Sequence, residues 1–241
     1  MTTGEVIGTG RSADVYDIGD GRVLRRYRDR RPAARVVTEA RVMEHAREAG
    51  VPVPEVFDVS GSEIVMERVT GPTMLAALAR RPWTAGAQAR LLASLHRLVH
   101  RIPASGPAAL GVPPLSFRLG GPRDTDVLLH RDLHPGNVIL GATGPVIIDW
   151  ESCAYGPAAA DIAMTWAIIG FSTLNGPRSQ AFAALGAQSL FARSFMREAE
   201  PIDEDTRATA VHDRLSDPHL LPAEAARLAK LIPRPRTAAD G

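Results

Sequence analysis

The chain has 241 residues, of which 45% are hydrophobic and 23% charged, a composition typical of a globular protein with a proper core. Its net charge of +1 gives no electrostatic argument for a nucleic-acid partner. The single cysteine, Cys153, excludes an internal disulfide and fits a reducing compartment. The N-terminus lacks the blocks of a signal peptide, and the longest apolar stretch, Ile162–Phe171, is too short to span a bilayer. We therefore expect a soluble, cytoplasmic monomer or homodimer with no membrane partner.

The first third of the chain predicts strands and one helix. β-branched and aromatic residues lie on either side of Gly19-Asp20-Gly21, which is a hairpin signal. Apolar residues then follow a helical period from Val36 to Arg47, which stops at Gly50 with Pro52 beyond. The predicted strands are Glu5–Ile18, Arg22–Tyr27, Glu55–Val59 and Ile64–Val69.

The remainder predicts mostly helices. The clearest pattern is Thr84–Ile102, with leucines on one face and Pro103 at its end. Residues 103–126 are rich in proline and glycine and predict an irregular loop, and no strand is expected between Gly71 and residue 138. Two short apolar runs on either side of Gly141–Gly144 predict a small hairpin. Further helices are predicted at 158–170, about 178–199, about 204–215 and 222–232.

Two segments carry a pattern that suits phosphoryl transfer. In residues 130–137, Asp132 precedes Asn137 by five residues in a turn-rich loop, and the apolar run 146–148 ends in Asp149. Transfer of a phosphoryl group needs a base that orients the attacking hydroxyl and oxygen ligands for Mg²⁺. Asp132 can supply the base, and Asn137 and Asp149 the oxygens.

These segments, HRDLHPGN and IIDWE, resemble the paired signature of aminoglycoside phosphotransferases and choline kinase-like enzymes, distant relatives of protein kinases. The resemblance implies an α+β, bilobal protein kinase-like fold that binds ATP or GTP with Mg²⁺. An N-terminal nucleotide-binding lobe with its connector would span 1–69, a helical catalytic and substrate lobe 70–232, and a flexible tail 233–241. It also implies Asp132 as catalytic base, Asn137 and Asp149 as Mg²⁺ ligands, and His130 as a structural strut.

The same resemblance implies a nucleotide site in the first lobe. The segment around Gly8 and Gly10 looks like the loop that covers the phosphates, although Ala13 replaces a third glycine. Val15 and Met66 would line the adenine pocket, and backbone groups of the connector would bind the adenine edge. The residues implied in this site are Gly8, Gly10, Arg11, Ser12, Val15, Met66, Glu67 and Val69.

The first lobe has no lysine where this family usually carries its phosphate-binding lysine; Lys230 is the only one in the chain. Strand alternation places Val23 and Arg25 on one face and Arg26 on the other. We expect Arg25 to face the phosphates and to pair with Glu39 on the following helix. The alternative is that both arginines are solvated strand residues.

Several alternatives stay open at this level. The sequence does not identify the acceptor hydroxyl compound. An aminoglycoside-like antibiotic, which would imply a role in antibiotic resistance, an amino alcohol, a sugar and a small metabolite all stay open. A nucleotide-binding pseudokinase with a regulatory or scaffold role is the main competing reading, because the usual lysine and the third glycine are missing. The acidic run from Glu198 to Asp205 reads as a solvated turn rather than as an acceptor wall. His96 and His100 have a metal-like spacing that is also common on exposed helices.

Overall fold

The computed structural model describes residues 4–10, 12–28, 32–115, 123–171, 178–217 and 220–231. In its N-terminal part an antiparallel sheet has the strand order β1-β2-β3-β5-β4. The β2–β3 hairpin turns at 19–21 as predicted, with Gly19 and Gly21 at positive φ. The strands are β1 Val6–Thr9, β2 Ala13–Gly19, β3 Arg22–Tyr27, β4 Val56–Ser60 and β5 Glu63–Glu67.

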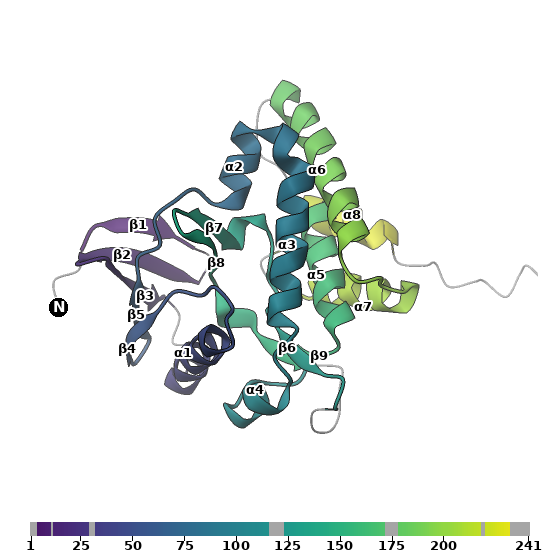
Figure 1. The fold of residues 1–241 in the computed structure, drawn as a ribbon. Helices are drawn as coiled ribbons and strands as arrows, with labels where there is room; N and C mark the ends of the chain where they lie inside the picture. Colours follow the sequence, from purple (N-terminus) through teal and green to yellow (C-terminus); the bar gives the residue numbers. More distant parts are fainter. Residues whose placement is uncertain are drawn as a thin grey trace, which may run out of the picture.

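Helix α1, Ala33–Glu48, packs beside this sheet (Figure 1). Its buried face includes Val36, Ala40 and Met43, which confirms the predicted helical period. The helix ends before Gly50, which adopts a left-handed φ of 84° and donates its amide to the Arg47 carbonyl at 3.0 Å. Glu39 lies on the buried face, so α1 presents a carboxylate toward the sheet.

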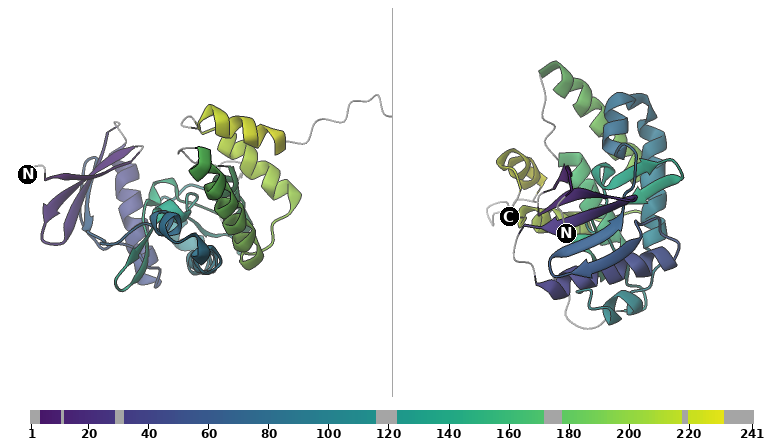
Figure 2. Two further views of the ribbon diagram at one scale, coloured as in Figure 1. Left: turned by 90° about the horizontal axis from the view of Figure 1, so that it is seen from above. Right: turned by 90° about the vertical axis from the view of Figure 1, so that its left-hand side faces the viewer.

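The second part of the chain is mostly helical (Figures 1 and 2). Seen from above in Figure 2, the sheet with α1 lies at one end and the last three helices at the other. Within this part α3 packs on α6, and α5 packs on α7. The α-helices are α2 Met74–Arg80, α3 Ala85–Val99, α4 Ser105–Ala109, α5 Ala158–Phe171, α6 Arg178–Glu198, α7 Glu204–Leu215 and α8 Pro222–Leu228. Short 3₁₀ turns are η1 Pro82–Thr84, η2 Pro135–Asn137, η3 Trp150–Ser152 and η4 Ala229–Leu231.

Two small strand pairs occur in the second part of the chain. Strands β7, Val138–Gly141, and β8, Gly144–Ile147, form the predicted hairpin. The other pair joins β6, Val127–Leu129, to β9, Ala154–Gly156. The prediction of no strand before residue 138 was therefore wrong. Strand β6 has only three residues and pairs with a strand far along the chain, so no local period reveals it.

The chain between the sheet and α2 passes close to the β7–β8 hairpin. Gly71 has a φ of 147°, and a Cβ on it would lie 2.3 Å from the Leu140 carbonyl oxygen, so only glycine fits. Leu140 in turn donates its amide to the Pro72 carbonyl at 2.9 Å. Thr73 then caps α2 by accepting from the Ala76 amide at 3.1 Å, as threonine commonly does at a helix N-terminus.

One main apolar core joins the sheet with α1, α3, α5 and α6. The predicted face of α3 is confirmed, because Leu92, Leu95 and Val99 are all fully or almost fully buried. Residues 105–109 form α4, so the loop expected over 103–126 is partly helical. The division into lobes at residue 69 stays a prediction, and the expected tail at 233–241 lies outside the described residues.

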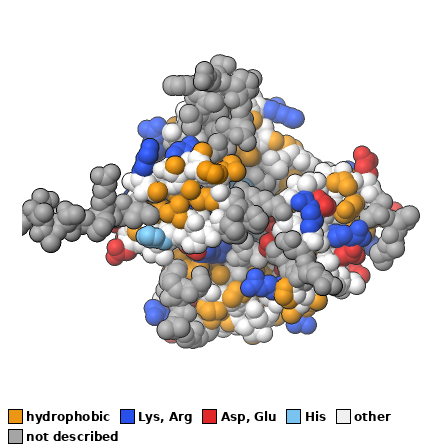
Figure 3. Space-filling model, turned by 180° about the vertical axis from the view of Figure 1, so that it is seen from behind, with side chains coloured by type: hydrophobic (Ala, Val, Ile, Leu, Met, Phe, Trp, Pro, Cys, Tyr) orange, Lys and Arg blue, Asp and Glu red, His pale blue; other side chains and the backbone are white. Residues whose placement is uncertain are grey.

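The surface shows both charges. On the described part of the face drawn in Figure 3, arginines, carboxylates and apolar side chains are interspersed, in keeping with the net charge of +1. Within the described ranges, none of the helices combines the length and the apolar character that crossing a membrane requires.

Candidate active site

Asp132 and Asn137 contact each other in the loop between β6 and β7. The Asn137 Nδ2 donates to the Asp132 carbonyl oxygen and to Asp132 Oδ2, at 2.9 Å each. His134 Nε2 lies 3.7 Å from the other carboxylate oxygen of Asp132. Because the amide nitrogen of Asn137 faces Asp132, its amide oxygen is the atom left for another partner.

His130 ties this loop to the segment after β8 that contains Asp149. Burial lowers the pKa of His130 to about 4, so the ring is neutral near pH 7. Its Nε2 donates to the Ile148 carbonyl at 3.1 Å, and its Nδ1 accepts from the Asp132 amide at 3.3 Å. These two bonds are compatible with one neutral tautomer. The ring also packs on Trp150, with centroids 4.7 Å apart.

The β7–β8 hairpin brings Asp149 back to Asn137. The Ile148 amide donates to the Asn137 carbonyl at 3.0 Å, so the residue before Asp149 is bonded directly to Asn137. Asp149 itself has a φ of 68°, a left-handed conformation that costs a non-glycine residue about 1 kcal/mol or more. Backbone strain of this kind is concentrated at functional sites.

Asp161, near the start of α5, braces the same loop from below. Its carboxylate accepts from the amides of Arg131 at 2.7 Å and His130 at 3.2 Å. His100 Nε2 lies 3.0 Å from Asp161 Oδ2, and His96 Nδ1 lies 3.4 Å from it. Burial would raise the pKa of Asp161, but the two histidines hold it well below its usual range.

His96 and His100, whose spacing resembles that of metal ligands, both lie beside Asp161. The carboxylate that the sequence did not place near them is Asp161, and the three ligand atoms lie within 4.8 Å of one another. His96 Nε2 bonds to the Thr165 hydroxyl, which donates to the Leu133 carbonyl at 2.9 Å. His100 therefore supports Asp161 directly, and His96 supports the loop backbone through Thr165.

Arg25 on β3 is buried and lies among three carboxylates. Its Nη1 donates to Glu39 Oε1 at 2.9 Å, and its Nη2 donates to Asp149 Oδ1 at 2.6 Å. The same Nη2 lies 3.3 Å from Glu151 Oε2. Burial would lower the pKa of Arg25, but Glu39 and Asp149 raise it, so the guanidinium stays charged. Arg25 thus connects the N-terminal sheet to the segment after β8.

Gly8 lies in β1, Gly10 follows that strand in the β1–β2 turn, and Ser12 just before β2 contacts the same region. The Gly10 amide donates to the Ala13 carbonyl at 2.9 Å, and Arg28 holds the turn through the Gly10 carbonyl at 2.8 Å. The Ser12 hydroxyl donates to Glu151 Oε2 at 2.5 Å, so the turn contacts the Arg25 cluster. Arg11 lies outside the described residues.

The predicted connector follows β5. Met66 is buried, and Val15 packs against the main core from β2. The Glu67 amide donates to the Glu55 carbonyl at 2.8 Å, so this N–H is used within the sheet. The Glu67 carbonyl and the Val69 amide are then the backbone groups that suit an adenine edge.

The comparisons with known proteins agree with this arrangement. A model of the phosphotransferase enzyme family matches residues 3–121 and 112–199, which together cover most of the chain. The chain belongs to this family. The expected kinship with aminoglycoside phosphotransferase-like small-molecule kinases is thereby confirmed, and so is the expectation of an enzyme that transfers phosphoryl groups.

Two solved structures show the fold of this phosphotransferase. The GDP complex of wild-type aminoglycoside 2'-phosphotransferase-IIIa is 14% identical, with a TM-score of 0.63 over 96% of this chain and 92% of that chain. The apoenzyme of macrolide 2'-phosphotransferase MphH from Brachybacterium faecium is 18% identical, with a TM-score of 0.53 over 97% and 92%. At these identities the likeness is one of fold, and it confirms the α+β, kinase-like class.

A curated relative matches a shorter stretch. A probable bifunctional tRNA threonylcarbamoyladenosine biosynthesis protein of Methanoculleus marisnigri is 42% identical over 78 residues, which cover 28% of this chain and only 15% of that protein.

Two residues that contact the Arg25–Glu39 pair, Glu151 and Tyr27, were not predicted as site residues from the sequence. Glu151 lies two residues after Asp149 in the IIDWE segment, but its contacts with Ser12 and Arg25 join distant parts of the chain. Tyr27 shares the buried face of β3 with Arg25, and its hydroxyl donates to Glu39 Oε2. Strand alternation was a signal that could have found Tyr27.

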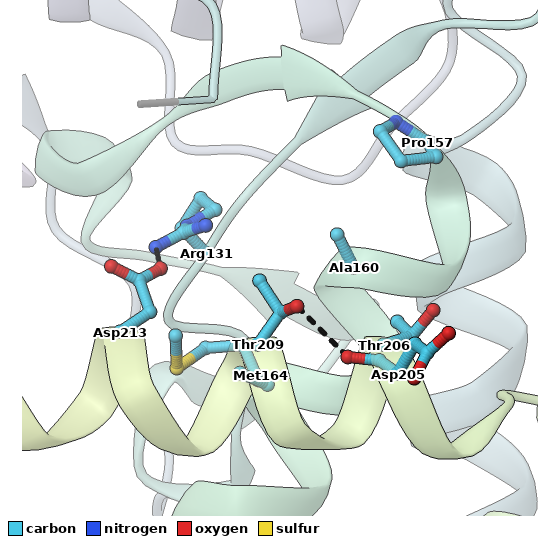
Figure 4. Close-up of a pocket in the computed structure, with 9 residues that line it drawn as sticks. Arg131, Pro157, Ala160, Met164, Asp205, Thr206, Thr209 and Asp213 are labelled. Atoms are coloured by element: carbon cyan, nitrogen blue, oxygen red, sulfur yellow. Dashed lines mark hydrogen bonds and ion pairs between the residues drawn. The ribbon is translucent and has the colours of Figure 1, made fainter. Parts of the chain in front are cut away.

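A pocket of about 210 Å³ lies between α5, α7 and the loop that carries Asp132 (Figure 4). Arg131, the residue before Asp132, lines it and forms an ion pair with Asp213 of α7. Arg131 has a φ of 71°. Like Asp149, it therefore adopts a left-handed backbone conformation close to the Asp132–Asn137 pair. Asp205, which belongs to the acidic run, lines the other end of this pocket.

Proposed function

We propose that this phosphotransferase moves the γ-phosphate of ATP or GTP to a hydroxyl of a small molecule, with Mg²⁺ as the metal ion. One observation carries the proposal. A continuous set of contacts runs from Asp132 through Asn137 to the Ile148–Asp149 backbone, and from Asp149 through Arg25 to Glu39. A base, metal-type oxygens and a phosphate-type cation are the parts that phosphoryl transfer needs in one place.

The side chains in this site fit Mg²⁺. Three carboxylates, Glu39, Asp149 and Glu151, contact the single guanidinium of Arg25, which leaves the cluster with excess negative charge. Mg²⁺ prefers oxygen ligands, and the amide oxygen of Asn137 and the second oxygen of Asp149 suit it. When bound, the ion would neutralise charge on the transferring phosphate.

Asp132 is the proposed catalytic base. It would accept the proton of the acceptor hydroxyl as that oxygen attacks the γ-phosphorus, while the bond to the β–γ bridging oxygen breaks and the nucleoside diphosphate leaves. The Nδ2 of Asn137 holds Asp132 Oδ2, which fixes the direction of the carboxylate. His130 and Asp161 hold the loop backbone on either side of this residue.

We place the nucleotide under the β1–β2 turn. Gly8, Gly10 and Ser12 would cover the phosphates, and Val15, Met66, the Glu67 carbonyl and the Val69 amide would surround the base. Arg25 would contact the phosphates with the nitrogen that now contacts Asp149. A structure of the same fold that contains GDP supports a nucleotide here.

We place the acceptor in the pocket beside Arg131. Pockets for drug-sized ligands usually measure about 300–1,000 Å³, so the pocket of about 210 Å³ suits one ring of an aminoglycoside-like antibiotic, a sugar or an amino alcohol. The hydroxyls of Thr206 and Thr209 and the carboxylate of Asp205 suit a hydroxylated and basic acceptor.

The test is a transfer assay on the Asp132→Asn variant. The wild type is first screened with ATP and GTP, Mg²⁺ and a panel of aminoglycosides, amino alcohols and sugars. Loss of a general base should lower turnover by about 10²–10⁴ while nucleotide affinity stays unchanged. Asp58→Asn, an exposed position on β4, is the matched control and should have normal turnover.

Two outcomes would contradict the proposal. Near-normal turnover of Asp132→Asn would remove the base. Nucleotide binding by the wild type without transfer to any acceptor or to water would favour the pseudokinase reading instead.

A further inference from the structure

Tyr27 contacts both members of the Arg25–Glu39 pair. Its hydroxyl donates to Glu39 Oε2, while Arg25 donates to the other oxygen, Oε1. The guanidinium carbon of Arg25 lies 4.9 Å from the centroid of the Tyr27 ring, within the range of a cation–π contact. All three side chains are buried, with exposures of 3% for Tyr27 and Glu39 and 8% for Arg25.

This arrangement controls where the second nitrogen of Arg25 points. An arginine beside a carboxylate tends to pair with both of its oxygens at once, through two parallel hydrogen bonds. Here Tyr27 takes one oxygen of Glu39, so Arg25 uses one nitrogen for Glu39. The other nitrogen then reaches Asp149 and Glu151 on the opposite side.

A lysine would not need this control, because its ammonium group is a compact point charge. A guanidinium is planar, and its use depends on the orientation of that plane. The ring of Tyr27 covers the guanidinium from one side, and the hydroxyl limits its pairing with Glu39.

We propose that Tyr27 is a positioning residue that keeps the Nη2 of Arg25 directed at the nucleotide phosphates, so that arginine can do the work for which this family usually has a lysine. The inference rests on the proposed function. Tyr27 does not touch the nucleotide in this scheme; it acts through Glu39 and Arg25.

The same sheet supplies a matched control. Arg26 lies over the ring of Tyr16 at 5.2 Å and donates to Glu63 at 2.6 Å, so it also has a tyrosine and a glutamate as partners. Alternation places this set on the other face of β3, and the Arg26 side chain is 36% exposed. Tyr16→Phe therefore removes a hydroxyl of the same kind from the same sheet.

The experiment measures the affinity of full-length Tyr27→Phe and Tyr16→Phe for ATP and for adenosine by calorimetry with Mg²⁺. Tyr27→Phe should weaken ATP binding by roughly five- to tenfold, the range of one ordinary net hydrogen bond, and leave adenosine binding within twofold. Tyr16→Phe should change neither. In an Arg25→Ala background, Tyr27→Phe should have no further effect on ATP affinity.

Equal losses for ATP and adenosine in Tyr27→Phe would make Tyr27 a packing residue and overturn the inference. So would unchanged ATP affinity, or a full effect that persists without Arg25. A wild type that binds ATP but transfers no phosphate would contradict the proposed function and still leave the Tyr27 effect measurable. A wild type that binds neither ATP nor GTP would overturn both.

Discussion

Adjacent residues of β3, Arg25 and Arg26, carry the same side chain into two different settings. Each arginine pairs with a glutamate and lies over a tyrosine ring. Arg25 is buried and also contacts Asp149 and Glu151, which come from the second part of the chain. Arg26 is more than a third exposed, and its partners Glu63 and Tyr16 belong to its own sheet. The two arginines have the same kinds of partner. They differ in burial and in whether they contact the second part of the chain.

The difference shows how burial determines the energetic contribution of an ion pair. An exposed pair gains little, because water and salt screen the charges and two side chains must be ordered, so its worth is about 0–1 kcal/mol. A buried pair is costly to break, since the charge that remains has no water to replace its partner. The buried cluster is also the one that joins the sheet to Asp149.

The largest difference between the two sites is expected when each arginine is replaced by alanine. Arg25→Ala should lower the free energy of unfolding by about 3 kcal/mol, because it leaves the buried carboxylate of Glu39 without its cation. It should also weaken ATP binding by about 10- to 100-fold and adenosine binding much less, because only the phosphates lose a partner. Denaturant unfolding and calorimetry measure the two effects.

Arg26→Ala is the control for this truncation. It should change the free energy of unfolding by no more than about 1 kcal/mol and leave both affinities as they are. Equal effects of the two truncations on ATP binding would erase the distinction between the two faces of β3.

A smaller effect is expected from replacing each arginine by lysine. Arg25→Lys keeps the charge but loses the planar fork that contacts Glu39 and Asp149 together, so ATP affinity should fall by roughly tenfold. Arg26→Lys, at an exposed position, should have almost no effect on ATP affinity. Higher ATP affinity in Arg25→Lys would show that the site still suits the lysine that this family normally uses.

Much of this contrast could be predicted from the sequence. Alternation along a strand has a period of two, so it separates Arg25 from Arg26 without any structure. The helical periods likewise predicted α1 and α3, because each buries an apolar face. The helices predicted after Pro157 are also present. The β7–β8 hairpin followed from two apolar runs around a turn.

Other features depended on contacts between distant segments. The bond from Ser12 to Glu151 joins residues 139 positions apart, and no local pattern encodes it. Asp161 braces the loop, but its two histidine neighbours, which are more than 60 positions earlier in the chain, become visible only in the folded structure. The pairing of β6 with β9 is of the same kind.

The smallest of the three effects concerns acid titration of Glu39 in the protein without nucleotide or Mg²⁺. Burial raises the pKa of Glu39 above its ordinary value of 4.5, and the single cation Arg25, which it shares with Asp149 and Glu151, offsets this only in part. The folded protein therefore binds a proton at pH values where the unfolded chain has already released it. Lowering the pH from 7 through the folded pKa should add to the free energy of unfolding, and this gain is complete below about pH 4.5.

Glu39→Gln cannot take up that proton. As the pH falls, the wild type should consequently gain stability relative to Glu39→Gln. The free energy of unfolding of the wild type minus that of Glu39→Gln should therefore increase. Urea unfolding at a series of pH values measures it, and Glu63→Gln controls for the loss of a glutamate charge from the partner of Arg26. A difference that moves the other way would mean that Arg25 and Tyr27 stabilise the Glu39 carboxylate by more than its burial costs. The interactions of the buried cluster would then more than offset the cost of burying its charges. Arg25 would differ from Arg26 only in its contacts with Asp149 and Glu151.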